Sequence, residues 1–512
     1  MTEYLDRPDG IEGPEIWVEE AIWGHRVYDE QTPWLTFLEF LTVFVAETEA
    51  GRGLKEPVLN SLSYRPQQQL LLRNIVFNNP FLTAIERQDL PDERKWTLWS
   101  AEMKKAAGGI PTDTDFIHLK DSFASFGEFG EIIGFLRNTA IEYESNKRWS
   151  SKFVFPFGKA CLYEDLRVQK QGVSVDRRFF ARSGELLYMM LCRSNFATEI
   201  NKYLANRLLS TEEPLAKLAE VLQAEPGLAR NPRCGSYLPY DHLQEYDALG
   251  QDWLSILRLE MPIYDALPHL VNLASLHMIR YIIGRCMAEV GSQGDPEFVC
   301  EIVGPKKTAV RDISADSFQG NQALPRQAME TRIRKVVDTE AWTTALESNN
   351  PVEEAAEVLR SEFDWPNQTD PTNDRSPDDL VERLVAKAGR RHKQHVAKVH
   401  AVWTRGLGLT SRRNSRRNRY APSDQLLKTL VICRVEKRME FKEFLQDLAD
   451  HYGMVIGDTQ AARWIEEGAA DQQDFSNNAR RLEQRLASLG LLNRLSDSCA
   501  YVENPFVRAI TS

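Results

Sequence analysis

The C-terminal part of the chain has a regular helical spacing of apolar residues, and this pattern constrains the fold more than any other feature. Positions i, i+3, i+4, i+7 and i+11 are occupied by Phe441, Phe444, Leu445, Leu448 and Tyr452. This spacing places five apolar side chains on one helix face, which must pack against other apolar elements. Gly453 follows directly, and glycine commonly ends a helix because it adopts the left-handed conformation without strain. The sequence therefore predicts a helix over 439–452.

Two further helices and a hairpin are predicted around this one. Ser423 or Asp424 can cap a preceding helix, which carries Leu426, Leu427 and Leu430. A third main helix is predicted after 474–476. Its inward positions and its terminator are Leu482, Leu486, Leu489 and Gly490. Two short strands around Ser496–Ser498 then complete a domain over 420–512. Three helices followed by a β-hairpin is the order of a winged helix, so we expect a winged-helix-like domain.

The rest of the chain is also predicted to be helical, so the expected fold class is mainly α. A chain of 512 residues should hold about two to four domains, because single cores rarely exceed about 250–300 residues. We expect a large helical body over 1–362, divisible into two subdomains at a Pro- and Gly-rich break near 226–240. A polar linker with three prolines is predicted over 363–379. A basic helix and arm follow over 380–419.

Aromatic residues are concentrated in the body, between Phe123 and Gly158. The mixture of polar and aromatic side chains is compatible with a ligand pocket, but a helix and loop packed by aromatics is the better prediction because aromatics mainly serve burial. A long apolar helix is predicted between Pro262 and Val290. Arg177, Arg178 and Arg182 precede another helix, where positive charge opposes the helix dipole, so an internal salt bridge is expected there.

Composition indicates a cytoplasmic protein. Hydrophobic residues make up 42% and charged residues 27% of the chain, which is ordinary for a globular protein. The apolar run over 35–46 is interrupted by Glu39 and is too short to cross a bilayer, so no membrane contact is expected. The N-terminus is acidic and polar, unlike a signal peptide. The seven cysteines are odd in number and scattered along the chain, which favours reduced thiols and argues against a disulfide framework.

A strongly basic stretch runs from Lys387 to Arg419. It holds eleven Lys and Arg residues and no Asp or Glu, on a chain whose net charge is −11. Such a concentration of positive charge is typical of a site for a polyanion such as DNA. We expect a helix through about Thr404 and then an arm that is disordered until it meets the polyanion. The candidate contacts are Arg390, Arg391, Lys393, Arg412, Arg413, Arg416, Arg417 and Arg419.

The third helix of the predicted winged helix offers side chains that can read bases. In such folds this helix enters the major groove, where Asn, Gln and Arg can bond to base edges. The candidate residues, all expected to be exposed, are Asn477, Asn478, Arg480, Arg481 and Arg485, with Gln484 on the same helix and Arg494 in the hairpin. Acidic neighbours such as Glu483 leave an alternative open, because many winged helices bind protein. The arm would supply affinity without sequence preference, and the helix any sequence reading.

No catalytic signature was found, and the sequence favours a non-catalytic protein with no cofactor. His392, His395 and His400 give an H-x2-H-x4-H pattern, but the surrounding cations disfavour a bound metal, so no metal site is expected. No Walker A loop, HExxH or GxSxG motif is present. Glu301 near Lys306 and Lys307 is a weak match to a nuclease centre. Catalytic residues stay unknown.

Several phrases resemble bacterial proteins encoded in antiphage-defence islands. They are FKEFLQDLADHYGMVIG, FSNNARRLEQRLASLGLLNRLSDSCAYVENPF, RRFFARSGELLYMML and LLLRNIVFNNP. The resemblance is to accessory components of a methylation-associated or related multigene defence system. It implies protection against phage together with other subunits, and it implies no defined activity. We therefore expect a non-catalytic component that binds DNA through its basic arm and winged helix. The alternatives are a protein–protein adaptor, or a nucleic-acid-processing enzyme with a site in the N-terminal body.

Overall fold

The computed structural model is mainly α-helical, which confirms the predicted fold class. It describes residues 13–24, 26–55, 62–141, 148–169, 172–175, 182–210, 212–224, 231–304, 308–365, 376–413, 416–496 and 499–507. The chain divides into two compact units, each built from separate stretches of sequence. Unit 1 holds 1–33, 193–196 and 235–512, and unit 2 holds 34–192 and 197–234. The boundaries predicted from the sequence stay predictions.

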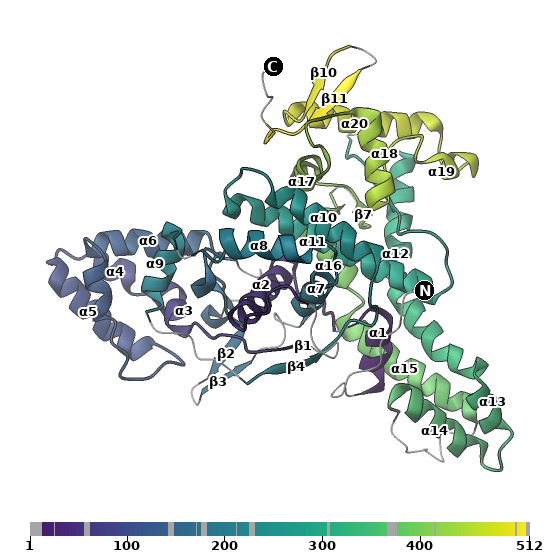
Figure 1. Ribbon diagram of the computed structural model, residues 1–512, viewed down its shortest axis with the longest axis horizontal. Coiled ribbons are helices and arrows are strands. Elements are labelled where there is room, and N and C mark those ends of the chain that lie inside the picture. The colour runs from purple at the N-terminus through teal and green to yellow at the C-terminus, as the bar shows by residue number, and fades with distance from the viewer. Residues whose placement is uncertain are drawn as a thin grey trace. The chain divides into compact units, whose positions relative to one another are not determined.

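Unit 1 is organised around α11 (Ile263–Glu289), the apolar helix predicted between Pro262 and Val290. Nearly every face of this helix is apolar, so it is stable only when neighbouring helices surround it. It packs against α1 (Pro14–Trp23), α10 (Gln244–Leu257) and α12 (Ala309–Arg334). Figure 1 shows these helices gathered in one part of the molecule.

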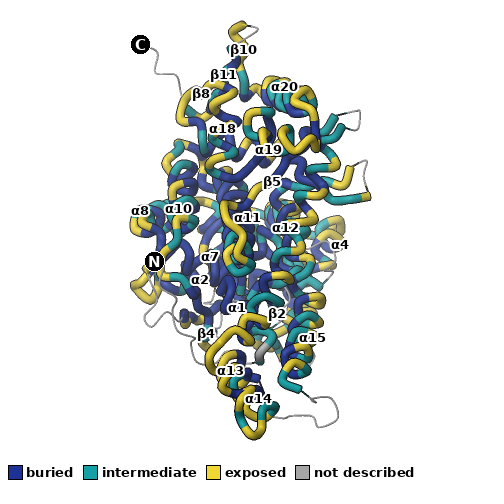
Figure 2. The backbone as a smooth tube through the Cα atoms, turned by 90° about the vertical axis from the view of Figure 1, so that its right-hand side faces the viewer, coloured by how far each residue is buried: buried dark blue, intermediate teal, exposed yellow. Residues whose placement is uncertain are grey.

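Helix α12 also packs against α15 (Pro377–His395) and α16 (Val399–Gly406), so it connects these two helices to the core around α11. Helices α13 (Glu340–Leu346) and α14 (Pro351–Phe363) extend beyond it, and exposed residues run along α13 (Figure 2). Ser376 caps α15 in a capping box with Asp379. Most of the predicted 363–379 linker, residues 366–375, lies outside the described residues.

The C-terminal segment of unit 1 combines short strands with four helices. They are α17 (Asp424–Arg434), β8 (Arg438–Glu440), α18 (Phe441–Tyr452), β9 (Met454–Val455), α19 (Ala462–Glu466), α20 (Gln472–Ser488), β10 (Leu492–Arg494) and β11 (Ala500–Glu503). The predicted hairpin is the antiparallel pair β10–β11, and Asp497 and Ser498 at its tip lie outside the described residues. β8 adds to β11, with Tyr501 opposite Glu440, so the sheet order is β10-β11-β8.

A parallel strand pair joins this segment to the middle of the chain. β5 (Phe298–Val299) lies beside β9, with Phe298 opposite Met454. Gly453, between α18 and β9, has φ of 71°, and a Cβ there would lie 2.0 Å from the Pro296 carbonyl oxygen. Only glycine fits this close approach. Val299, Val310, Val455 and Phe475 then share one buried cluster, so the segment and α12 have a common core.

Unit 2 is held by aromatic packing and by buried ion pairs. Its elements are α2 (Pro33–Glu49, from Trp34), β1 (Leu62–Tyr64), α3 (Leu70–Phe77), α4 (Leu82–Glu86), α5 (Asp92–Ala106), α6 (Phe126–Asn138), β2 (Leu166–Gln169), β3 (Gly172–Val175), α7 (Ser183–Cys192), α8 (Ala197–Arg207) and α9 (Pro214–Leu222), and β4 (Arg233–Ser236) begins in it. Trp99 and Phe129 are buried with ring centroids 4.8 Å apart, which confirms that the aromatic-rich segment serves the core.

The expected internal salt bridge also lies in unit 2. Arg182 bonds Glu185 at 2.9 Å, and Arg233 lies 3.2 Å from Glu39 and 3.3 Å from Glu164. All three carboxylates are buried, so each needs a cationic partner. Arg177 and Arg178 lie outside the described residues. Across the described part of the chain, none of the helices is both long and apolar enough to span a membrane.

Candidate functional site

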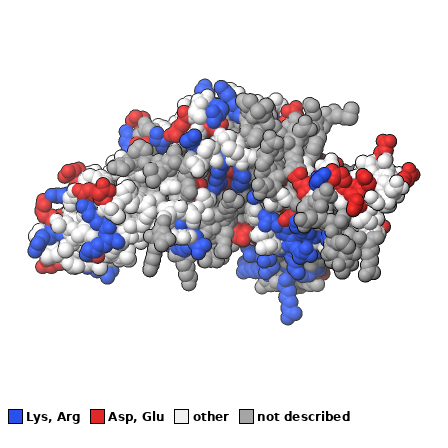
Figure 3. Space-filling view, turned by 90° about the horizontal axis from the view of Figure 1, so that it is seen from below, with Lys and Arg blue, Asp and Glu red and all other residues white. Residues whose placement is uncertain are grey.

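The basic stretch occupies two helices and a strand pair, all of which pack against α12. On α15, Arg390 and Lys393 are exposed, and no carboxylate of the described residues pairs with either one. Figure 3 shows one face of the molecule on which Lys and Arg side chains form one large group. A cation that lacks an internal partner is available to a phosphate. Arg390 and Lys393 therefore remain candidates for DNA contact.

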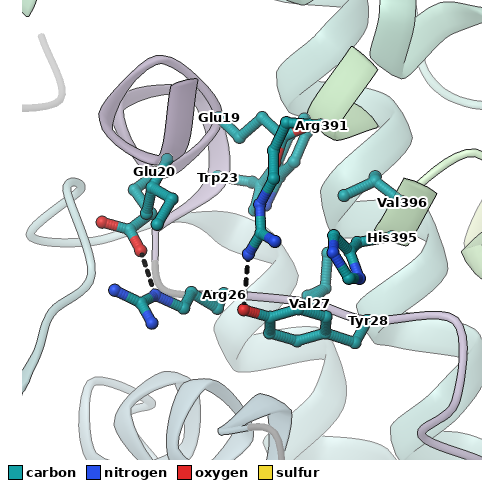
Figure 4. A pocket seen from close by; sticks show the side chains of 10 residues that line it. Glu19, Glu20, Trp23, Arg26, Val27, Tyr28, Arg391, His395 and Val396 are labelled. Atoms are coloured by element: carbon teal, nitrogen blue, oxygen red, sulfur yellow. Dashed lines mark hydrogen bonds and ion pairs between the residues drawn. The ribbon is translucent and has the colours of Figure 1, made fainter. Parts of the chain in front are cut away.

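Arg391 lies on a different face of α15, toward the N-terminal segment. Its guanidinium donates to the Tyr28 hydroxyl at 2.7 Å and lies over the Tyr28 ring (Figure 4). His395 packs edge-on against the same ring, and its carbonyl accepts from the Asp29 amide. The surrounding crevice holds only about 10 Å³, little more than one water molecule. This contact attaches the N-terminal segment to α15 and leaves no room for a ligand.

The three histidines of the H-x2-H-x4-H pattern have separate partners. His392 lies 3.3 Å from Glu19, and His400 bonds the Tyr420 hydroxyl at 2.8 Å. Burial lowers the pKa of His400 to about 3, so its imidazole is neutral. His395 faces Tyr28 instead. The pattern is therefore explained by packing, because each ring is used by a different neighbour.

Asp29 makes this junction sensitive to pH. Burial and then the neighbouring Glu30 carboxylate raise the pKa of Asp29 to about 7, against the opposing charge of Lys398. The folded protein therefore keeps a proton that the unfolded chain loses above the ordinary Asp pKa of 3.8. Stability contributed by this site is full below that value and is lost as pH rises to about 7.

We expect Asp29→Asn to remove this loss. The variant should melt at a higher temperature than the parent at pH 8 and at nearly the same temperature at about pH 3, because the parent carboxyl is then mostly protonated in both the folded and the unfolded chain. Thermal melts of both proteins across this range provide the measurement. A difference in melting temperature that does not change with pH would contradict the assignment.

The predicted arm is ordered where the structure describes it, and the expectation of disorder there is wrong. β6 (Thr410–Ser411) pairs antiparallel with β7 (Arg419–Tyr420), and 414–415 lie outside the described residues. Arg412, Arg413 and Arg416 are exposed at the turn, and within the described residues no carboxylate pairs with them. Arg417 pairs with Asp316. The strand pair therefore presents three guanidinium groups without carboxylate partners among the described residues, of which Arg412 donates one hydrogen bond to Asn418.

Arg419 is fully buried, and its expected place on the surface is wrong. Its guanidinium pairs with Glu301, which is also buried and also accepts from Arg311 at 2.9 Å. A buried carboxylate needs such partners because desolvation otherwise disfavours its charge. Glu301 was the weak nuclease candidate, and its carboxylate is occupied by two arginines. Lys306 and Lys307 lie outside the described residues.

Helix α20 has exposed residues along its length (Figure 2). The polar residues at helical spacing on its exposed side are Gln473, Asn477, Arg480 and Gln484. Arg485 is partly buried and bonds Asp424 at 2.6 Å, and Arg481 packs against Gly304. Of the predicted reading residues, Arg480 is exposed and Asn477 is half-buried. These two side chains, with Gln484, have the donors and acceptors needed at a base edge.

Asn478 is buried, so the expectation that it is exposed is wrong. Its side-chain oxygen accepts from the Ile302 amide at 2.7 Å, and its nitrogen donates to the carbonyls of Cys300 and Ile456. It thus joins α20 to the chain beside both β5 and β9. The sequence could not distinguish this role from base reading, because Asn477 and Asn478 are chemically identical neighbours.

The two asparagines provide a matched comparison. Asn478→Ala should lower the free energy of unfolding by about 2–4 kcal/mol, because three buried backbone groups lose their partner. Asn477→Ala should change the free energy of unfolding by less than about 0.5 kcal/mol, as expected for a surface site. Urea unfolding followed by tryptophan fluorescence would measure both. Equal effects of the two substitutions would contradict the structure.

A buried polar cluster was not found from the sequence. His277 lies between two carboxylates, with Nδ1 2.6 Å from Glu245 and Nε2 2.8 Å from Asp252. His451 lies 3.1 Å from the second oxygen of Asp252. Burial alone would lower the pKa of His277, but its hydrogen bonds to the two acids raise it to about 9. The two acids lie 32 and 25 positions away from His277 along the chain, so no local sequence pattern indicates these contacts.

The comparisons with known proteins give one family. Residues 305–504 match the family model of methylation-associated defense system protein MAD7. The match runs from just before α12 to the end of β11. No curated protein and no solved structure matches the chain. The family match confirms the resemblance to defence-system components, supports a role in antiphage defence and suggests that other subunits act with this chain.

Proposed function

We propose that this chain, with its MAD7 family match over residues 305–504, is a DNA-binding component of a bacterial antiphage defence system. The observation that carries the proposal is a set of exposed cations that lack acidic partners among the described residues. The set is Arg390, Lys393, Arg412, Arg413 and Arg416. The chain as a whole has net charge −11, so these side chains are a local exception to its charge. Affinity for phosphate, without sequence preference, follows from them.

The order of elements in the C-terminal segment supports a winged-helix interpretation. Helix α17, strand β8, helices α18, α19 and α20 and the β10–β11 pair follow one another, with the short β9 after α18 and with α19 as a helix beyond the three that were predicted. β8 adds to the edge of the pair. In this arrangement α20 takes the place of the helix that enters the major groove, and the β10–β11 turn the place of the wing. Asn477, Arg480 and Gln484 on the exposed side of α20 would then face bases.

The proposal is tested by a salt series with the full chain and a labelled duplex. If the five cations each contact one phosphate, the logarithm of the association constant should fall with the logarithm of salt concentration with a slope of about −4 to −5. Fluorescence anisotropy would measure this slope between about 50 and 300 mM salt, because phosphate contacts weaken over roughly this range. Absence of measurable binding at the lowest salt would overturn the proposal.

An adaptor role is the second candidate, because two large apolar side chains are exposed at the far end of the same segment. Leu495 is 61% exposed beside β10, and Phe506 is 43% exposed after β11. Exposed apolar side chains contact the surface of another protein more favourably than they contact the phosphate backbone of DNA. The salt series separates the candidates, since an adaptor shows no salt-dependent affinity for duplex DNA. Phe506→Ser, which lies after β11 and away from the β10–β11 turn, should leave DNA binding unchanged if DNA is the partner.

A further inference from the structure

The buried cluster of unit 1 brings two imidazoles and a carboxylate to one point. Asp252, His277 and His451 each offer a ligand atom, and these atoms lie within 4.8 Å of one another. They come from α10, α11 and α18, so three separate helices converge on the same position. Asp252 and His277 are fully buried, and His451 is half-buried. Nitrogen and carboxylate donors in this proportion are the set that zinc prefers.

The groups around the cluster have the arrangement of outer-shell partners in metal sites. Glu245 lies 2.6 Å from His277 Nδ1, which leaves Nε2 directed at the cluster. Metal-bound histidines almost always have such a carboxylate behind them, because it fixes the ring orientation and the tautomer. The Tyr452 hydroxyl donates to Asp252 Oδ2 at 2.6 Å. Both contacts orient ligand atoms before any ion is bound.

Arg434 also reaches the cluster, with Nη1 3.2 Å from Asp252 Oδ1 and 3.3 Å from His451 Nε2. Its charge is balanced on the other side by Asp447, which accepts two hydrogen bonds at 2.7 and 2.9 Å. Because this pair is neutral as a whole, Arg434 does not add an excess positive charge. A bound ion would take the place of Arg434 at Asp252 Oδ1 and His451 Nε2.

A pocket of about 280 Å³ adjoins the cluster and is lined by Glu245, Arg280 and His451. Carboxylates around the pocket and cluster outnumber guanidinium groups by five to three, with Glu245, Asp252, Asp295, Asp447 and Asp450 against Arg280, Arg285 and Arg434. A metal ligand must be a neutral imidazole, so a bound cation would replace the proton that His277 shares with Glu245 and Asp252. The region would then have two excess negative charges, which one divalent cation would balance. The pocket is also large enough for water or a small ligand beside that cation.

We propose that Asp252, His277 and His451 bind a divalent transition-metal ion of the zinc class, with one coordination position open toward the adjoining pocket. Three protein ligands and an open position are the arrangement of zinc sites that act on a ligand, whereas purely structural sites have four protein ligands. Zinc bonds nitrogen at about 2.0–2.1 Å, so a bound ion would replace the present hydrogen bonds of the two imidazoles to Asp252. The proposal is independent of DNA binding.

The test is metal analysis of the full chain, purified without a polyhistidine tag and incubated with zinc sulfate before desalting. We expect about one zinc per chain, and visible absorption from tetrahedral cobalt when cobalt chloride replaces zinc. His451→Gln should weaken zinc binding by at least about tenfold, because a direct ligand is lost. His451 is half-buried, so this variant is the least disruptive of the three ligand changes.

His242→Gln is the matched control. His242 also faces a carboxylate, at 3.3 Å from Asp247, but lies outside the cluster, so this variant should keep the zinc. Circular dichroism of both variants confirms that they fold. Well under one zinc per chain in the parent, or equal zinc in the parent and in folded His451→Gln, would overturn the proposal and leave the cluster as an ion-pair network. Loss of zinc in both variants would also overturn it, because the site would then lie elsewhere.

Discussion

Replacement of Arg412, Arg413 and Arg416 by alanine is expected to weaken binding of duplex DNA by about tenfold to a hundredfold at low salt. The three guanidinium groups are exposed on the β6–β7 turn, and no carboxylate in the described residues neutralises them. Each lost phosphate contact should also reduce the salt slope by about 0.9, so the triple variant should lose nearly three units of slope. Anisotropy titrations of parent and variant at several salt concentrations measure both effects.

The matched control replaces three exposed arginines that already have carboxylate partners in the same unit. Arg326 pairs with Glu330, Arg334 with Glu382 and Arg360 with Glu357. Alanine at these positions changes the net charge by the same amount, yet it should alter the salt slope by less than about one unit. If both triple variants lose the same affinity, the total charge of the chain determines binding and the β6–β7 turn has no special role.

Glu301→Ala is expected to destabilise unit 1 by about 3–5 kcal/mol, which is the second large effect. The substitution leaves Arg419 buried without a counter-charge and removes a partner of Arg311. Urea unfolding followed by tryptophan fluorescence should show the transition at a lower denaturant concentration. Because Arg419 is the fully buried partner, Glu301→Leu combined with Arg419→Met should recover much of the loss.

A neighbouring ion pair provides the comparison for Glu301. Glu297 lies four positions earlier and bonds Arg463 at 2.9 Å, but both side chains are about half-exposed. Glu297→Ala should therefore cost less than about 1 kcal/mol, because water solvates the remaining charge. A similar cost for the two substitutions would show that Arg419 reaches solvent after all.

Helices could be predicted from the sequence because their signal is local. The spacing of Phe441 to Tyr452 and the stop at Gly453 correspond to α18, whose C-cap is that glycine. The long apolar run corresponds to α11 in the same way. The apolar residues of α18 lie on one face and those of α11 on nearly every face, so the extent of burial can be predicted from residues within a few turns of each other. The resemblance to defence proteins depends on similar local phrases, and the family match confirms it.

The fate of individual polar side chains could not be predicted, because it depends on partners far along the chain. Arg419 is buried by Glu301, which is 118 residues away, and Asn478 by Ile302, which is 176 residues away. His451 meets Asp252 across 199 residues. A charge pattern indicates where positive residues are concentrated, but the side chains that point outward are determined by the tertiary fold. Two of the residues predicted to contact DNA, Arg419 and Asn478, therefore lie in the interior.

The parallel pair of β5 with β9 has a practical consequence for anyone who wishes to isolate the C-terminal segment. A fragment beginning at residue 420 would leave β9 as an unpaired edge and would leave Asn478 without the partners at Cys300 and Ile302. Exposed strand edges favour aggregation. A shortened version for crystallisation or for grafting onto another protein should therefore begin before β5. The C-terminal segment is therefore not expected to fold as an independent domain without β5.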